Sequence, residues 1–301
     1  MNTPTGNTVS TAEHAFALML ATARNIAPAH AGVLAGDFKN SRKAFSGIEM
    51  NGKRLAVIGM GRIGSEFVKR AQGFNMKVVA FDPFLTQARA DELKIELADS
   101  PDAVLDGADV VTLHVPLTDD TRHIINAERL ALMNKGGLIV NCARGGLIDE
   151  NALKAAIDMG HIAGCALDVY ENEPPSTDHP LFSCKKHVAF TPHLGASTSE
   201  AEENCAFMVA SQITEFLQNG NIKNSVNFPE VNLERTRGSF RLAVVNRNVP
   251  KILGSVLSAL ADKNINVLDM LNKSKGEIAY NLIDIDTKVS DQLLSEISRI
   301  E

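Results

Sequence analysis

The chain has 301 residues, 45% of them hydrophobic and 22% charged, a composition typical of a globular protein with room for two or three domains. Its formal net charge is −6 and no long basic run occurs, which argues against nucleic acid and anionic membranes as partners. No apolar stretch approaches the roughly 20 residues of a membrane span, and the polar first residues do not resemble a signal peptide. The four cysteines form no CxxC pair, which predicts reduced thiols in a cytoplasmic protein, with no disulfide frame and no metal site.

The chain is expected to start with a loop and a buried helix. Residues 2–8 are rich in Asn, Thr, Pro and Gly, and Ser10 or Thr11 is the expected N-cap of the helix that follows. Apolar residues between positions 12 and 27 predict a helix with a buried face. Residues 39–51 are polar and are expected to form a connector.

The central feature of the sequence is a glycine-rich junction. An apolar run at residues 55–58 predicts a strand, and residues 65–72 predict a helix. Gly59 permits the tight turn, Gly61 lets the backbone approach a pyrophosphate, and Gly64 lets the helix pack closely on the strand. The free N–H groups and the positive dipole end of the helix would then face the phosphates. An αβ turn without a ligand is the alternative.

Asp82 strengthens the interpretation of this junction as a dinucleotide site. It ends the next predicted strand, residues 77–81, and lies 18 residues after Gly64. An acidic residue near this position is placed to bind the adenosine ribose hydroxyls. Its charge would repel a 2′-phosphate, so the sequence predicts NAD in preference to NADP as the cofactor.

Further apolar segments alternate with helical ones along the chain. They predict strands at residues 109–115, 137–142, 162–169 and 187–191. Nearly continuous apolar strands separated by helices indicate an α/β fold with a Rossmann-type, doubly wound parallel sheet. Ligands of such sheets bind beyond the carboxyl ends of the strands. The residues at those ends are Gly59, Asp82, His114, Arg144, Asp168 and His193.

A different pattern follows this α/β region. Residues 199–219 predict a long amphipathic helix, and residues 221–238 are polar and irregular, as expected of a linker. The remaining segments predict the order β-α-β-β-α, which is an α+β unit about one strand short of a ferredoxin-like fold. The predicted elements are strands at 241–245, 265–271 and 278–286, with helices ending at 263 and starting at 290.

Three polar residues are candidates for acid–base chemistry. Arg144 could hold a carboxylate bidentately, and His193 could exchange a proton with a hydroxyl near neutral pH. Glu173 could pair with His193 and favour its imidazolium form. Such a set beside a nicotinamide is what oxidation of a 2-hydroxy acid requires. Each residue alone also fits a structural role, as a surface ion pair or a structural hydrogen-bonding group.

At these residues the chain resembles the D-isomer-specific 2-hydroxyacid dehydrogenases, and within them the branch that acts on 3-phosphoglycerate. The resemblance covers nearly the whole chain. Its first motif is discontinuous and comprises Asn2-Thr-Pro4, Asn7-Thr8, Ser10 and Ala12-Glu-His14. The others are Gly59-Met-Gly-Arg-Ile-Gly64, Leu113-His-Val-Pro-Leu117, Asn141-Cys-Ala-Arg-Gly-Gly146, Ala166-Leu-Asp-Val-Tyr170 with Glu173-Pro174, Thr191-Pro-His-Leu-Gly-Ala-Ser-Thr198 and Asn224-Ser-Val-Asn-Phe-Pro-Glu230.

The resemblance implies NAD-linked oxidation of 3-phosphoglycerate to 3-phosphohydroxypyruvate, the entry step of serine synthesis. Arg144, Glu173 and His193 match the catalytic trio of the family, with His193 as proton donor and acceptor. The residues expected to bind the cofactor are Gly59, Gly61, Arg62, Ile63, Gly64, Asp82, His114, Val115, Cys142, Ala143, Arg144, Asp168, His193, Gly195 and Ala196.

Residues 239–301 resemble an ACT domain, a small regulatory module, without its last strand. Asn248 and Asn266 match positions that bind serine in some members, so L-serine is a candidate effector. Asn246 and Lys251 depart from that pattern, and a module used solely for assembly is the alternative. The resemblance also predicts a homo-oligomer.

The resemblance further implies a chain truncated at both ends, because family members place a substrate lobe before the segment with which this sequence begins. The expected domains are a substrate-domain remnant with a dimer helix (1–50), the NAD-binding domain (51–193), a return helix (194–220), the linker (221–238) and the ACT-like domain (239–301). Two alternatives remain open, namely reduction of another 2-oxo acid such as hydroxypyruvate or glyoxylate, and an NAD(H)-sensing protein without catalysis.

Overall fold

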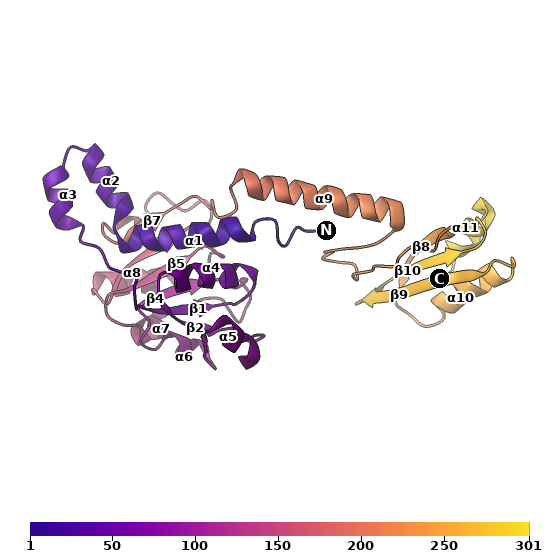
Figure 1. Ribbon diagram of the computed structural model, residues 1–301, viewed down its shortest axis with the longest axis horizontal. Helices are drawn as coiled ribbons and strands as arrows, with labels where there is room; N and C mark the ends of the chain where they lie inside the picture. Colours follow the sequence, from indigo (N-terminus) through magenta and orange to yellow (C-terminus); the bar gives the residue numbers. More distant parts are fainter. Residues whose placement is uncertain (301) are drawn as a thin grey trace. The chain divides into compact units, whose positions relative to one another are not determined.

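The computed structural model describes residues 1–300, which form two compact units. One unit contains residues 7–201, and the other contains residues 1–6 together with residues 202–300. The long helix α9 (Ser199–Asn219) begins in the first and continues into the second (Figure 1). Within residues 1–300, none of the helices combines the length and apolar character needed to cross a membrane.

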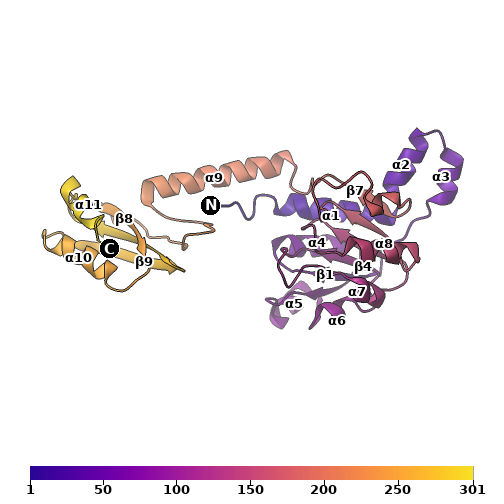
Figure 2. The ribbon, with the colours of Figure 1, turned by 180° about the vertical axis from the view of Figure 1, so that it is seen from behind.

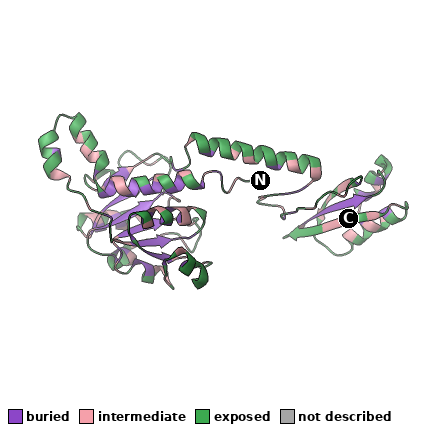
Figure 3. Cartoon of the chain, in the orientation of Figure 1, coloured by how far each residue is buried: buried purple, intermediate pink, exposed green. Residues whose placement is uncertain are grey.

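A seven-stranded parallel sheet forms the centre of the 7–201 unit, which confirms the predicted Rossmann-type architecture. Its order is β3-β2-β1-β4-β5-β6-β7, and its strands are mostly buried (Figure 3). The edge strand β3 was not predicted, because its two residues are only partly covered and form no apolar run. The strands are β1 (Arg54–Ile58), β2 (Lys77–Phe81), β3 (Glu96–Leu97), β4 (Val110–Leu113), β5 (Gly137–Asn141), β6 (Ile162–Leu167) and β7 (Val188–Phe190).

Helices cover both faces of this sheet, as a doubly wound fold requires. Each face has its own apolar core, one centred on Phe67 and Met19 and the other on Leu105 and Leu130. The first face carries α1 (Thr8–Ala23), α4 (Arg62–Gly73) and α5 (Gln87–Leu93), and the second carries α6 (Pro101–Leu105), α7 (Ala127–Leu132), α8 (Glu150–Asp158) and the short 3-10 helix η1 (Pro180–Ser183) (Figures 1 and 2).

The N-terminal helix differs from the prediction at both ends. It begins at Thr8 with Asn7 at the N-cap position, not at Ser10 or Thr11, because its first turn is already buried against the sheet. It stops at Ala23, because Asn25 adopts a left-handed conformation with φ +53° and is fully buried.

Two further helices occupy the segment after this turn. They are α2 (Ile26–Leu34) and α3 (Phe38–Ala44). The prediction of a polar connector over residues 39–51 is therefore wrong for its first part. Few apolar side chains of α2 and α3 are covered, so their sequence carries a weak periodic signal.

The glycine-rich junction is as compact as its sequence predicts. Gly59 has φ +97°, and a Cβ placed on it would lie 2.5 Å from the carbonyl oxygen of His114. A Cβ on Gly64 would lie 2.1 Å from the carbonyl oxygen of Gly59. Helix α4 therefore begins at Arg62, directly above the end of β1, and its first turn packs against the strand end.

We expect Gly64→Ala to lower the free energy of unfolding by at least about 2 kcal/mol, because backbone atoms must move to admit the methyl group. Gly73→Ala, in the same helix, is the matched control, since a Cβ there meets no atom within 4 Å. Urea unfolding measures both variants. Equal stability of the two would contradict the close approach at Gly64.

The second unit contains an antiparallel sheet of order β8-β10-β9. Its elements confirm the predicted order β-α-β-β-α. Both helices pack on one face, around Val256, Leu260 and Ile283. The elements are β8 (Phe240–Arg247), α10 (Ile252–Ala261), β9 (Val267–Lys275), β10 (Ile278–Ile285) and α11 (Asp291–Ile297).

The expected linker, residues 221–238, packs against the opposite face of this sheet. Ile222 and Val231 pair through their backbones and are buried against Tyr280 and Leu282. The segment that was expected to be a linker therefore packs on the sheet through Ile222 and Val231. The segment is polar overall, so its few buried apolar residues did not stand out. Their partners in β10 lie about 50 residues further along the chain.

Candidate active site

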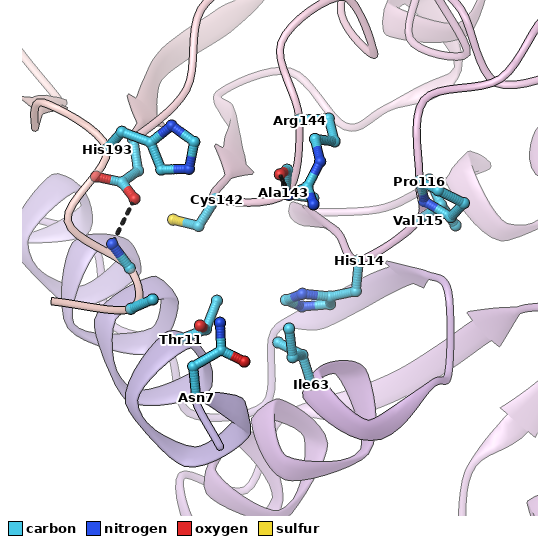
Figure 4. A pocket seen from close by; sticks show the side chains of 13 residues that line it. Asn7, Thr11, Ile63, His114, Val115, Pro116, Cys142, Ala143, Arg144 and His193 are labelled. Carbon is cyan, nitrogen blue, oxygen red and sulfur yellow. Dashed lines mark hydrogen bonds between the residues drawn. The ribbon is translucent and has the colours of Figure 1, made fainter. Parts of the chain in front are cut away.

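A pocket of about 290 Å³ lies at the carboxyl ends of the central strands of the large sheet (Figure 4). The start of α1 and the start of α4 form its other walls. Ten of the residues predicted to bind cofactor line it. The lining residues are Asn7, Thr11, Ile63, His114, Val115, Pro116, Cys142, Ala143, Arg144, Asp168, His193, Gly195 and Ala196.

Arg144 is presented by a rigid loop after β5. The side chain of Asn141 accepts a hydrogen bond from the Ala143 N–H (3.0 Å) and donates one to the Arg144 carbonyl (2.9 Å). The guanidinium is exposed and, among residues 1–300, pairs with no carboxylate. The alternative role of Arg144, as one partner of a surface ion pair within the chain, is therefore not seen in residues 1–300. Arg144 Nη1 donates to the Ala143 carbonyl (2.6 Å), and the other guanidinium donors can bind a carboxylate ligand.

His193 and Glu173 form a direct pair. The Nδ1 atom of His193 lies 2.8 Å from Oε2 of Glu173, and the other carboxylate oxygen accepts the Tyr170 N–H (3.1 Å). Partial burial acts to raise the pKa of Glu173, but the hydrogen bonds from His193 and Tyr170 outweigh it and lower the pKa below its ordinary value. His193 has φ +59°, a left-handed conformation that is uncommon for non-glycine residues.

Asp168 is a fully buried carboxylate at the end of β6. It accepts the N–H groups of Leu194 (2.7 Å) and Gly195 (2.8 Å) and the hydroxyl of Thr191 (2.6 Å), and His14 Nε2 lies 3.1 Å away. Burial acts to raise its pKa, but these hydrogen bonds prevail and lower the pKa to about 2. Asp168 is therefore ionised at neutral pH and holds in place the loop that follows His193.

Two titratable groups in the pocket are uncharged at neutral pH. Burial lowers the pKa of His114 to about 4, and its ring lies against Phe67 with centroids 5.2 Å apart. Burial, and then the charge of Asp168, raise the pKa of the Cys142 thiol. His114 and Cys142 therefore add no charge to the pocket wall beyond the ends of β4 and β5.

The glycine loop beside the pocket fits the phosphates of a dinucleotide. Helix α4 has no side-chain N-cap, and a Cβ on Gly61 would meet no atom within 4 Å, so this side of the loop is open. Arg62 and Ile63 form the first helical turn. Asp82 accepts the N–H groups of Met60 (2.7 Å) and Phe84 (2.8 Å), which fixes its carboxylate beside this loop. The residues present therefore fit NAD.

Several residues of the site were not predicted. Asn7 and Thr11 reach the pocket from α1, and Pro116 reaches it from the loop after β4 (Figure 4). Asn7 belongs to one of the segments shared with the family, which was the only available signal. His14 and Thr191 contact Asp168, and they too lie in segments shared with the family without being expected as site residues.

The two predicted serine ligands are not brought together within one chain. Asn248 follows β8 and contacts the β9–β10 turn at Gly276. Asn266 precedes β9 and contacts Asp286 beyond the other end of β10. The length of β10 separates them, so a serine site that uses both would need residues from two copies.

We expect Asp168→Asn to lower the free energy of unfolding at pH 7 by roughly 2 kcal/mol, the equivalent of a pKa held at about 2 instead of 3.8. A lowered pKa stabilises the fold above about pH 4, and this contribution is lost as the pH falls toward 2. The difference between wild type and variant should therefore shrink between pH 5 and pH 3 in urea unfolding. Asp99→Asn, an exposed change of equal charge, is the control. A difference independent of pH would contradict this account.

Comparison with known proteins identifies the family. The model of the D-isomer specific 2-hydroxyacid dehydrogenase NAD binding domain matches residues 16–195. D-3-phosphoglycerate dehydrogenase of Methanocaldococcus jannaschii is 42% identical over 95% of this chain and 52% of its own length. The Haemophilus influenzae enzyme of the same name is 34% identical over 100% of this chain and 73% of its own. The chain thus spans about half the length of several relatives.

Solved structures agree with this comparison. A glyoxylate reductase from Paecilomyes thermophila has a TM-score of 0.68 and 33% identity over 74% of this chain and 66% of its own. A D-lactate dehydrogenase from Aquifex aeolicus, complexed with NAD and lactic acid, has a TM-score of 0.63 and 32% identity over 71% of this chain and 68% of its own. These findings confirm the resemblance and NAD as the cofactor, and the chain belongs to the D-isomer specific 2-hydroxyacid dehydrogenase family.

Proposed function

We propose that this chain carries the reaction centre of an NAD-dependent dehydrogenase that interconverts 3-phosphoglycerate and 3-phosphohydroxypyruvate, the entry step of serine synthesis. The observation that carries the proposal is the His193–Glu173 pair at the pocket that Arg144 also lines. The pair occupies Nδ1 of His193. Among residues 1–300, no hydrogen bond occupies Nε2, which remains available to a ligand.

Each of the three residues has a distinct role in this proposal. His193 Nε2 takes the proton of the substrate hydroxyl during oxidation and returns it during reduction. The Glu173 carboxylate stabilises the imidazolium that forms. Arg144 binds the substrate carboxylate bidentately and so orients the carbon that is oxidised. Bound NAD⁺ supplies the acceptor for the hydride that leaves this carbon.

The relatives named D-3-phosphoglycerate dehydrogenase support 3-phosphoglycerate as the substrate. The structural similarity to a glyoxylate reductase supports a smaller 2-oxo acid as the second candidate. NADH oxidation by the purified chain, followed by absorbance, tests both with 3-phosphohydroxypyruvate, hydroxypyruvate and glyoxylate. NADH binding without turnover of any of them would instead favour a cofactor-sensing protein.

We expect His193→Gln to lower kcat by about 10²- to 10⁴-fold, because the amide cannot exchange a proton with the substrate. NADH affinity should change far less, since the proton that His193 exchanges belongs to the substrate hydroxyl and not to the cofactor. His30→Gln is the control, because His30 is exposed on α2 in the same unit. Equal turnover of His193→Gln and wild type would exclude the proposed proton transfer.

We expect Asp82→Asn to weaken NADH binding by about 10- to 100-fold, through the loss of charge-assisted hydrogen bonds. NADPH binding should weaken less or improve, because the charge that opposes a 2′-phosphate is removed. Because the chain contains no tryptophan, titration followed by the fluorescence of NADH or NADPH itself measures both, with Asp99→Asn as the charge-matched control. An unchanged ratio of the two affinities would remove Asp82 from cofactor selection.

A further inference from the structure

A partly buried hydrogen bond between Glu150 and His179 lies beneath the loop that carries Glu173, outside the pocket. We propose that Glu150 and His179 are positioning residues for the reaction proposed above, and that they act by fixing the Tyr170–Glu171 peptide. This inference rests on the proposed function for its catalytic consequence, while the anchoring itself can be measured without turnover. Neither residue lines the pocket, so both would act through other groups.

The pair is built into the protein interior. Oε2 of Glu150 lies 2.8 Å from Nε2 of His179, and the two side chains are only 12% and 9% exposed. The His179 ring packs against Tyr170 and Phe182, with centroid distances of 5.9 and 4.8 Å. Because so little of either side chain is exposed, water competes less for this hydrogen bond than for one between exposed side chains.

The second oxygen of Glu150 reaches the loop of Glu173. It accepts the N–H of Glu171 at 3.0 Å. The preceding N–H, that of Tyr170, donates to Glu173 at 3.1 Å. Two consecutive amides of one turn are therefore engaged, the first by Glu173 and the second by Glu150. Rotation of this turn would move the Glu173 carboxylate away from His193.

The same peptide contacts the supports of the other two proposed catalytic residues. A Cβ on Gly145 would lie 1.7 Å from the Tyr170 carbonyl oxygen, so the loop that follows Arg144 packs directly on this peptide. The Tyr170 hydroxyl donates to the Thr191 carbonyl at 3.1 Å, two residues before His193. The loops that carry Arg144, Glu173 and His193 thus all contact Tyr170 or its peptide. Glu150, together with His179, holds the turn to which Tyr170 belongs.

The test compares three variants of the full chain. Glu150→Ala removes the anchor, and we expect kcat to fall about 10- to 100-fold, as for a misplacement near 1 Å, with the KM for NADH unchanged. Glu150→Gln keeps a carbonyl oxygen for the Glu171 N–H and should recover most of the loss. Asp149→Ala removes the N-cap of the same helix, α8, and should destabilise the protein without the fall in kcat.

Hydrogen exchange of the Glu171 amide is measured on the same proteins and does not need turnover. It should be faster in Glu150→Ala than in wild type, and unchanged in Asp149→Ala after correction for global stability. Unchanged exchange, an unchanged kcat, or an equal fall of kcat in Asp149→Ala would each overturn the proposal. Should wild type reduce none of the three 2-oxo acids, the proposed function fails, and the exchange of Glu171 still decides whether Glu150 anchors this turn.

Discussion

The buried charge of Asp168 is the constraint on which the 7–201 unit depends most. A carboxylate removed from water is costly unless hydrogen bonds replace its hydration. Asp168 gains them from two backbone N–H groups after β7, from Thr191 and from His14 on α1. The requirement to satisfy one ion therefore brings together a strand end, a covering helix and the loop of His193.

The parallel sheet explains how residues from distant parts of the sequence come together in one site. Each strand delivers the residue at its carboxyl end to the same edge, so that Gly59, His114, Cys142, Asp168 and the segment before His193 meet across neighbouring strands. Loops that follow the strands are then fixed by their own hydrogen bonds, as Asn141 fixes the loop of Arg144. Preorganised polar groups in such an edge lose little freedom when a ligand binds.

The second unit depends on a different buried ion pair. Arg241 donates from Nε and Nη2 to Asp284, and both side chains are almost completely buried. Burial acts to raise the pKa of Asp284, but the hydrogen bonds from Arg241 and Thr236 lower it below the ordinary value. Arg241 also donates to the carbonyls of Asn219, at the end of α9, and Leu233. The segment that joins α9 to β8 is therefore held to the sheet by one guanidinium.

Local patterns predicted six strands of the large sheet and the element order of the second unit, but they missed β3, α2 and α3. Most residues that line the pocket were expected from the family resemblance. Gly59, Gly61, Gly64 and the apolar strands predicted the Rossmann-type sheet, because backbone sterics and side-chain periodicity act within a few residues. The contributions of Asn7, Thr11 and His14 were not predictable in this way, nor was the burial of Ile222 and Val231. The contact of Glu150 with His179 and with the Glu171 N–H was likewise not predictable from local patterns. Each of these depends on a contact between residues distant along the chain, which no local pattern encodes and only the packed structure creates.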